Sequence, residues 1–280
     1  MSTPPNHNPY APGHAPSQVQ HHEWRTAENS AAHLLPHLQR AASQNPSLTL
    51  LDVGAGSGTI SASLAKYMPQ GHIVATDISD SILARAREFA DAQRVKNISF
   101  QKASVYELPY EDGRFDVVHA HQVLCHLDAP VEAVKEMVRV LKPGGLLALR
   151  ESDMRMWCFW PEAEGLLKFH ELMVGVLLAN GGHDKGGRRL VSWVMEAGAE
   201  RESIEAGFGT WCYSKPEDRK TWGNAMIERL RSGQMREKGM ELGLTTEEGV
   251  EEMIKAWEEW IETPDATLGI MNGEVIVKKA

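Results

Sequence analysis

The fold of this chain is decided by the stretch Leu51-Asp52-Val53-Gly54-Ala55-Gly56-Ser57-Gly58. A short apolar run at residues 48–53 ends directly in these glycines, and helical periodicity follows at residues 59–67. Glycines at a strand-to-helix turn let the backbone approach a ligand closely, and the helix N-terminus presents free N–H groups. About twenty residues further on, Asp77 follows a second apolar run, where a carboxylate can accept hydrogen bonds from ribose hydroxyls. Glycines alone also occur in ordinary turns, but together with Asp77 they predict a nucleoside-binding site.

Short apolar runs alternate with helical patterns on both sides of this turn. Strands that alternate with helices form a mostly parallel sheet with helices on both faces. The expected strands are residues 48–53, 72–76, 98–101, 115–120 and 146–150, and the helices between them are residues 59–67, 79–92 and 130–141. The sequence therefore predicts an α/β fold.

Composition and pattern also divide the chain into regions. Residues 1–20 are rich in Pro, Asn, Ser and His and almost lack aliphatic residues, which predicts a disordered tail. Residues 21–280 are expected to form one domain. Its parts are an N-terminal lid helix at 21–46, a ligand-binding core at 47–152, a helical cap at 153–200 and 214–264, and the last strands at 201–213 and 267–278. Within the second part of the cap, Gly233 and Gly243 are expected to break the helical pattern.

The overall charge and the cysteines narrow the range of partners. The formal net charge is −9, without a dense basic run, which argues against a nucleic acid as partner. The three cysteines contain no Cys-x-x-Cys pair and fit a reducing compartment. No apolar run is long enough to span a bilayer and no apolar signal core is present, so we expect a cytoplasmic protein without membrane insertion. The sequence leaves the oligomeric state open.

The spacing of the glycines bears on which nucleoside binds. A dinucleotide fold favours Gly-x-Gly-x-x-Gly. Here the third glycine, Gly58, comes one residue early, and Thr59 occupies the usual position. This shift disfavours NAD and leaves a nicotinamide oxidoreductase as a weaker alternative.

Three motifs resemble those of class I S-adenosylmethionine-dependent methyltransferases. Residues 51–58 look like motif I of these enzymes. Leu108-Pro109-Tyr110 with residues 115–118 resembles a segment of the UbiE/COQ5-like group, as does the turn at residues 141–145. The resemblance covers residues 48–150 and implies a Rossmann-like fold. That fold has a mostly parallel seven-stranded sheet, helices on both faces and, in this chain, an inserted helical cap.

Two further stretches narrow the resemblance to fungal enzymes. Residues 24–30 and the Gly187-Arg188-Arg189 segment are similar to members of this group that modify secondary metabolites, in particular the gliotoxin-type bis-thiomethyltransferases. This narrower resemblance implies a small-molecule acceptor and S-adenosyl-L-methionine as cofactor. S-adenosyl-L-homocysteine would then be the product, and no metal is needed.

The resemblance also implies roles for individual residues. Ser104 stands where the family usually has an Asp that contacts the adenine amino group, and a hydroxyl makes a weaker contact than a carboxylate. The expected cofactor contacts fall into three sets. Gly54, Ala55 and Gly56 lie under the methionine part, with Arg25 at its carboxylate and His121 at the mouth between cofactor and acceptor; Asp77 lies at the ribose; and Ile78, Ser104 and Val105 lie at the adenine.

The sulfonium group of this cofactor is a strong electrophile, so the protein must mainly align the acceptor and exclude water. A base is needed only if the acceptor is protonated at working pH. We expect His121 and Asp153 to be catalytic, with Glu151 as a further candidate; each can also have a structural role. His119, His121 and His126 do not form a zinc-ligand pattern, so we expect no metal site.

Aromatic residues crowd the region after the fifth expected strand. Trp157, Phe159 and Trp160 are expected to bind the acceptor, because such residues line apolar ligand pockets. More aromatic residues follow at Trp211, Tyr213, Trp222, Trp257 and Trp260, where packing of the cap helices is the alternative explanation.

The acceptor is therefore expected to be a small apolar secondary metabolite. The fungal resemblance implies the thiols of a reduced epidithiodioxopiperazine such as dithiol gliotoxin. A thiol has a pKa near 8.5 and needs little base catalysis. The alternatives are O- or C-methylation of a quinone, sterol or polyketide, and a regulatory pseudo-enzyme that binds the cofactor without methyl transfer.

Overall fold

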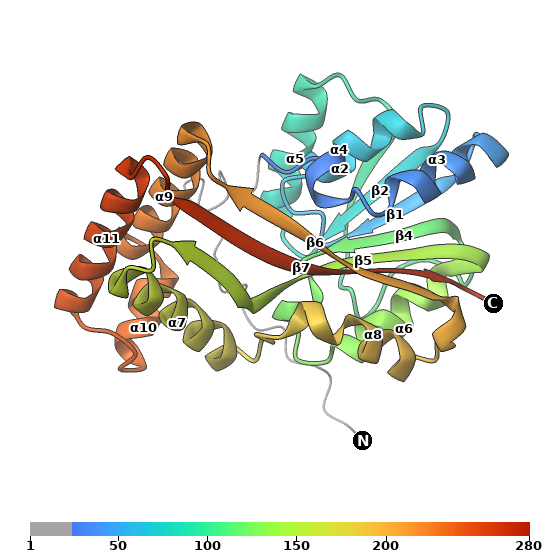
Figure 1. Cartoon of the computed structure of the whole chain (residues 1–280). Coiled ribbons are helices and arrows are strands. Elements are labelled where there is room, and N and C mark those ends of the chain that lie inside the picture. Colours follow the sequence, from blue (N-terminus) through green and yellow to red (C-terminus); the bar gives the residue numbers. More distant parts are fainter. Residues whose placement is uncertain (1–23) are drawn as a thin grey trace.

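The computed structural model describes residues 24–280, so the tail expected at residues 1–20 lies outside the described residues. A seven-stranded sheet with the order β3-β2-β1-β4-β5-β7-β6 organises the molecule (Figure 1). Strands β1 to β5 run parallel, and β7 is antiparallel to both of its neighbours. The strands are β1 Thr49–Val53, β2 His72–Asp77, β3 Ile98–Lys102, β4 Phe115–His121, β5 Leu141–Trp160, β6 Ile204–Tyr213 and β7 Thr267–Lys278. The predicted fold class is confirmed.

Helices cover both faces of this sheet. On one face, α2 Ala27–Ser30, α3 Leu35–Gln44, α4 Thr59–Leu64 and the 3₁₀ turn Ala65–Tyr67 pack against the sheet. On the other face lie α6 Pro130–Val140 and α8 Gly186–Glu196. Helix α5 Asp80–Ala92 connects β2 to β3, and short 3₁₀ turns lie at Leu124–His126 and Arg201–Ser203. Neighbouring residues of the central strands point to opposite faces, and both faces are buried: Leu50 and Leu51 of β1 are each 0% exposed.

Four more helices form the cap at one end of the molecule: α7 Glu164–Ala179, α9 Pro216–Arg231, α10 Gln234–Glu241 and α11 Glu247–Glu262. The breaks between the last three fall at Gly233 and Gly243, as the sequence predicts, and Gly243 has a φ of +67° that favours glycine. The cap helices enclose their own apolar core, which includes Phe169, Trp257 and Trp260.

Strand β5 is much longer than the expected residues 146–150. It pairs with β7 from Leu146 opposite Lys278 to Trp160 opposite Thr267, with a register irregularity between Ser152 and Trp157. Beyond this irregularity the two strands, together with the end of β6, leave the core and run under the cap helices (Figure 1). The aromatic segment after Arg155 is therefore the second half of a strand.

The N-terminal segment also differs from the expected single helix at 21–46, because it forms the two helices α2 and α3. Asn29 and Thr26 form a capping box at the start of α2, and the backbone leaves helical geometry at Ala31. Pro36 then lies in the first turn of α3, where its missing N–H costs nothing but where it cannot continue a preceding helix. The sequence Leu34-Leu35-Pro36 thus starts a new helix.

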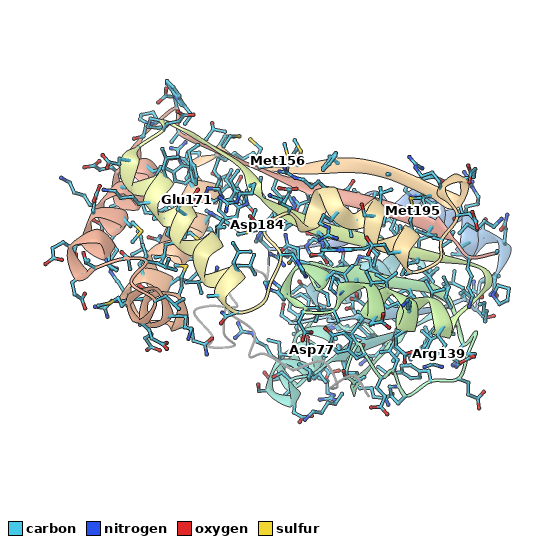
Figure 2. All side chains as sticks on the ribbon, turned by 90° about the horizontal axis from the view of Figure 1, so that it is seen from below. Asp77, Arg139, Met156, Glu171, Asp184 and Met195 are labelled. Atoms are coloured by element: carbon cyan, nitrogen blue, oxygen red, sulfur yellow. The ribbon has the colours of Figure 1, made fainter. Side chains whose placement is uncertain are left out.

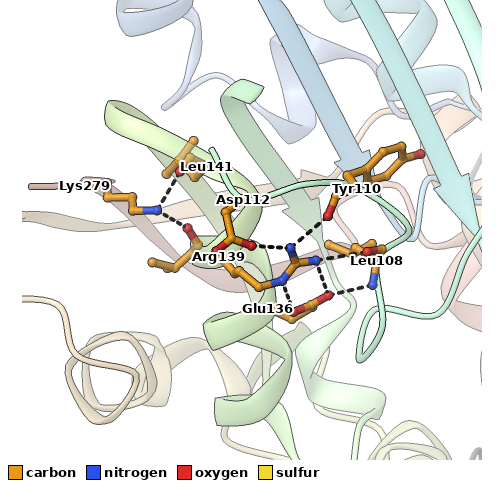
Figure 3. A network of polar contacts seen from close by, with 8 residues as sticks. Leu108, Tyr110, Asp112, Glu136, Arg139, Leu141 and Lys279 are labelled. Atoms are coloured by element: carbon orange, nitrogen blue, oxygen red, sulfur yellow. Dashed lines mark hydrogen bonds and ion pairs between the residues drawn. The ribbon is translucent and has the colours of Figure 1, made fainter. Parts of the chain in front are cut away.

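One of the motifs quoted above has a structural explanation in Figure 3. The guanidinium of Arg139 in α6 donates to the carbonyl oxygens of Leu108 at 3.0 Å and Tyr110 at 2.8 Å, and to Asp112 at 2.6 Å. Glu136, one turn earlier, accepts from the N–H of Leu108 at 2.7 Å. The Leu108-Pro109-Tyr110 stretch is thus fixed to α6, on the way from β3 to β4.

Candidate active site

The glycine turn after β1 uses its three glycines for two different reasons. All have positive φ values, of +68° at Gly54, +55° at Gly56 and +72° at Gly58. A Cβ at Gly54 would come within 2.5 Å of Val123, and one at Gly58 within 2.8 Å of Ala86 in α5. A Cβ at Gly56 would meet no heavy atom within 4 Å. Gly54 and Gly58 therefore let the turn pack, whereas Gly56 keeps the backbone approachable from outside.

Asp77 lies at the end of β2 beside this turn. One oxygen of its carboxylate accepts from the N–H of Gly56 at 3.1 Å, and the other accepts from the N–H of Ser79 at 3.0 Å. Figure 2 shows Asp77 at the end of the core that faces the cap helices. The next residue, Ile78, is 47% exposed, which leaves it accessible to a flat apolar group.

Ser104 and Val105 follow β3 on the same edge of the sheet. The hydroxyl of Ser104 accepts from the N–H of Tyr106 at 3.2 Å, and its carbonyl accepts from the N–H of Glu107 at 3.2 Å. Val105 packs against the apolar core below. Both residues lie where the resemblance implies adenine contacts, but the Ser104 hydroxyl also stabilises a local turn.

The end of β4 joins the core to the N-terminal segment. Gln122, directly after His121, has a φ of +53°, a strained conformation for a residue other than glycine. Its side-chain oxygen accepts from Arg25 at 2.8 Å, and its amide donates to Asn272 of β7 at 3.1 Å. Gln122 thus connects three parts of the chain, a role that no sequence pattern indicated. Its only signal was its place next to His121.

Two arginines surround an aromatic ring near His121. The guanidinium carbon of Arg25 lies 5.1 Å and that of Arg150 lies 4.5 Å from the ring centroid of Trp211. The Trp211 indole donates to the carbonyl of Asn29 at 2.7 Å. The N-terminal segment is therefore fixed to β6 by polar and ring contacts, and Arg25 lies at the edge of the predicted cofactor site.

His121 lies in this positive environment. Its ring centroid is 5.6 Å from that of Trp211, and its side chain is buried. Burial, followed by the charges of Arg25 and Arg150, holds its pKa well below the usual value of 6.5. Among residues 24–280, neither ring nitrogen has a hydrogen-bond partner. His121 is thus neutral at physiological pH, and taking up a proton there is unfavourable.

The two carboxylates at the end of the core half of β5, residues 141–153, have structural partners. Glu151 is fully buried and accepts from the N–H groups of Val123 and Leu124 at 2.8 Å each, and from Cys125 at 3.2 Å. Burial raises its pKa. Its carboxylate therefore holds the loop after β4 in place, which is the structural alternative for this candidate base.

Asp153 is engaged in the same way by helix α8. One of its oxygens accepts from Arg188 Nε at 2.6 Å and from the Arg188 backbone N–H at 3.1 Å, and the other accepts from Arg188 Nη2 at 2.7 Å. Both carboxylate oxygens of Asp153 are thus occupied by a bidentate arginine pair, which fixes the orientation of the side chain. This geometry favours a positioning role for Asp153 over the expected catalytic one.

The three aromatic residues expected to bind the acceptor do not act together. Trp157 and Phe159 point to the inner side of β5, where Trp157 stacks on His170 at 5.6 Å and Phe159 contacts Trp257 at 6.0 Å. Trp160 lies on the opposite side, is 58% exposed, and donates to Asp265 at 3.0 Å. Alternation along a strand separates them. Only Trp157 and Phe159 are brought to the side that faces the cap.

Two expected absences concern only the described residues. No group of three or more His, Cys, Asp or Glu side chains within residues 24–280 is arranged to hold a metal ion. Over the same residues, no helix combines the length and the apolar character needed to cross a membrane.

The site fits an adenosine-containing cofactor. A glycine turn open at Gly56, the Asp77 carboxylate directly beneath it and the exposed Ile78 follow one another along the same edge of the sheet. In open α/β sheets, ligands bind at the carboxyl ends of the strands, where these groups lie. The fold and this site together define a Rossmann-like methyltransferase.

Comparisons with known proteins identify the family. The methyltransferase domain family matches residues 51–149. An uncharacterized methyltransferase of Schizosaccharomyces pombe is 30% identical over 293 residues, which cover 100% of this chain and 99% of the relative. The ubiquinone/menaquinone biosynthesis C-methyltransferase of Vibrio vulnificus is 29% identical over 176 residues, covering 60% of this chain and 66% of the relative.

A solved structure shares the fold. Phosphoethanolamine N-methyltransferase 2 of Haemonchus contortus, in complex with phosphomonomethylethanolamine and S-adenosylhomocysteine, superposes with a TM-score of 0.55 at 17% identity. The match covers 89% of this chain and 53% of that protein. The chain belongs to the S-adenosylmethionine-dependent methyltransferases. It is also similar to a UbiE-type C-methyltransferase, as its motifs predicted.

Proposed function

We propose that this enzyme transfers a methyl group to a thiol of a small apolar secondary metabolite, of which a reduced epidithiodioxopiperazine such as dithiol gliotoxin is the best candidate. The observation that carries the proposal is the state of the three candidate bases. Glu151 and Asp153 are occupied by structural partners, and His121 is buried in a positive field. An acceptor that ionises without a strong base fits this site.

The positive field has a second consequence for the acceptor. The charges of Arg25 and Arg150 disfavour the protonated form of His121. The same charges favour an anion placed near that ring, which offsets part of the cost of burying a thiolate there. A thiol starts from a pKa near 8.5 and a phenol from about 10, so the thiol gains the larger reactive fraction at neutral pH.

When bound, S-adenosylmethionine would supply a methyl group on its sulfonium sulfur. A thiolate would bond to this methyl carbon while the bond from the carbon to the cofactor sulfur breaks, which leaves S-adenosylhomocysteine. The residues of this chain have the remaining tasks. Asp77 and the turn at Gly56 hold the nucleoside end, and the N-terminal segment with Trp24 and Arg25 closes the side next to β6. The thiol proton is released to solvent, because the candidate bases near the site are engaged or disfavoured as proton acceptors.

The test offers the full chain matched dithiol, phenol and carboxylate acceptors and counts the transferred methyl groups by mass spectrometry. We expect one and then two methyl groups on the dithiol. Turnover confined to the phenol or the carboxylate would contradict the assignment of a thiol as the acceptor. Binding of the cofactor without transfer to any acceptor would favour the regulatory pseudo-enzyme.

The pH dependence of the rate gives an independent check. We expect the dithiol rate to rise with pH as the thiol ionises, for the wild type and for His121→Asn alike, because the His121 pKa lies well below 6.5. The variant should lose about tenfold in kcat or less, as expected for a residue that shapes the site. An inflection between pH 6 and 7 present only in the wild type would show that His121 acts as a base.

A second candidate is methylation of a ring carbon of a quinone. The Vibrio vulnificus relative is named as a C-methyltransferase of ubiquinone and menaquinone biosynthesis, and it aligns with 60% of this chain. The same mass spectrometry separates the two, because S-methyl groups leave on desulfurisation whereas ring methyl groups remain.

A further inference from the structure

The cap halves of the three long strands form an ordered aromatic floor. Across the sheet, Trp157 of β5, Ile270 of β7 and Trp211 of β6 are direct neighbours. Side chains at directly paired positions point to the same face of a sheet. The next row along has Phe159, Leu268 and Tyr213 in the same arrangement. Five of these side chains belong to the buried apolar cluster under the cap helices, and the partly buried Trp157 packs against it.

Ring contacts extend this floor from the core to the cap. Trp211 lies 5.6 Å from His121 at the end of β4 and 5.4 Å from Trp24 of the N-terminal segment. Trp24 lies 5.4 Å from Tyr213, and Tyr213 stacks at 4.5 Å on Trp222 of α9. Trp222 in turn lies 5.9 Å from Trp157. The rings thus form one continuous surface that begins next to the predicted cofactor site.

Several polar atoms on this surface are buried without a partner. Among residues 24–280, the indole nitrogens of Trp24 and Trp157 and the hydroxyl of Tyr213 have no hydrogen bond. Tyr213 is only 5% exposed, and burial raises its pKa, so the hydroxyl keeps its proton. Buried polar groups in native proteins are nearly always hydrogen-bonded, and exceptions call for an explanation. Three of them on one ring surface indicate a ligand that completes them.

The chemistry of these groups determines which functional groups the ligand must carry. An indole N–H is a donor only, and a protonated phenol hydroxyl donates when a suitable acceptor is near. The ring surface itself favours flat apolar groups. We propose that Trp24, Trp157 and Tyr213 form an acceptor-binding subsite for a planar apolar ring that carries carbonyl oxygens, which accept hydrogen bonds from these three side chains. This inference rests on the proposed small-molecule transfer, but not on which atom receives the methyl group.

Trp257 provides a matched control within the same cluster. Its indole nitrogen is also buried without a partner among the described residues, and it lies 5.3 Å from Trp260 and 5.2 Å from Phe169. These neighbours belong to the cap helices, away from His121 and the N-terminal segment. Trp257 also contacts Phe159 at 6.0 Å, but Phe159 carries none of the three proposed hydrogen-bond donors. Trp257→Phe therefore removes the same kind of N–H group without changing Trp24, Trp157 or Tyr213.

The experiment measures binding of a benzyl-substituted 2,5-piperazinedione by calorimetry. This probe carries two ring carbonyls and no thiol, and the full chain is saturated with S-adenosylhomocysteine. We expect Tyr213→Phe, which keeps the ring, and Trp157→Phe, which keeps an aromatic but smaller ring, to weaken its binding about five- to tenfold each. Trp257→Phe should bind it like the wild type. In a dithioxo analogue, sulfur replaces both oxygens and is a weaker hydrogen-bond acceptor. The affinities of the variants for this analogue should therefore differ less from that of the wild type.

Each outcome decides the proposal separately from the thiol assignment. Absence of probe binding to the wild type, equal binding by Trp157→Phe and Tyr213→Phe, or an equal loss in Trp257→Phe would overturn the subsite. Because the probe has no thiol, a failed thiol methylation leaves these results unchanged. Unchanged affinity of the variants for S-adenosylhomocysteine shows that a loss arises at the acceptor side and not from misfolding.

Discussion

The two halves of strand β5 differ in whether their buried polar groups have hydrogen-bond partners. In the core half, Glu151 accepts from three backbone N–H groups and Asp153 forms a bidentate pair with Arg188. In the cap half, the Trp157 indole lies in a buried cluster without a partner among the described residues. The paired groups hold the fold in the core half, whereas the unpaired Trp157 indole belongs to the acceptor subsite proposed above. The change between the two halves falls at the irregularity after Ser152.

The largest expected effect comes from removing a paired group in the core half. Glu151→Ala leaves the N–H groups of Val123, Leu124 and Cys125 without their acceptor, so we expect unfolding to become easier by about 3–4 kcal/mol. Urea denaturation measures this loss. The matched change in the cap half, Trp157→Phe, removes part of a partly buried ring and should cost about 1–2 kcal/mol. Similar losses in both variants would remove the distinction between the two halves.

The next effect concerns cofactor binding and should be confined to the core. Asp77→Asn and Asp77→Ala should weaken S-adenosylmethionine binding by about 1.5–3 kcal/mol, the scale of a charge-assisted hydrogen bond. Calorimetry measures the affinity, with Trp157→Phe as the control that leaves it unchanged. Wild-type affinity in both Asp77 variants would contradict the ribose assignment.

The smallest expected effect is the acid sensitivity caused by His33, which precedes α3 and lies beside Glu274 of β7. Burial lowers the pKa of His33 from 6.5 to about 3, although Glu274 lies 3.9 Å away. Because the unfolded chain binds this proton first, stability is complete above about pH 6.5 and falls as the pH decreases toward 3. Between pH 6.5 and 5.5 this one group should cost about 1 kcal/mol.

Denaturation at the two pH values tests this expectation with His33→Asn as the comparison. The variant should lose less stability on acidification than the wild type by about that amount. Parallel pH profiles of the two proteins would show that His33 does not carry the effect.

The sequence predicted the core well because its signals are local. The alternation of strands and helices, the glycine turn and Asp77 at the end of β2 each depend on short stretches, and all are found where they were expected. The glycine breaks at Gly233 and Gly243 are local signals too.

The cap half and the long-range contacts of the core could not be predicted in the same way, because both depend on distant partners. Strand β5 extends to Trp160 only because β7, more than a hundred residues later, pairs with it. The partner of Asp153 is in α8, and Gln122 connects residues 97 and 150 positions away. The outward direction of Trp160 follows from alternation once the segment is known to be a strand, which the aromatic composition alone did not show.

The place of β7 has a consequence for how the chain folds during synthesis. In the sheet β7 lies between β5 and β6, yet it follows both of them along the chain, and Leu146 waits for Lys278 as its partner. Contacts between residues so far apart form slowly, because a long loop must close first. Until β7 leaves the ribosome, β5 has an unpaired edge that exposes backbone N–H and C=O groups to other chains. We expect the nascent protein to be most prone to aggregation in that interval.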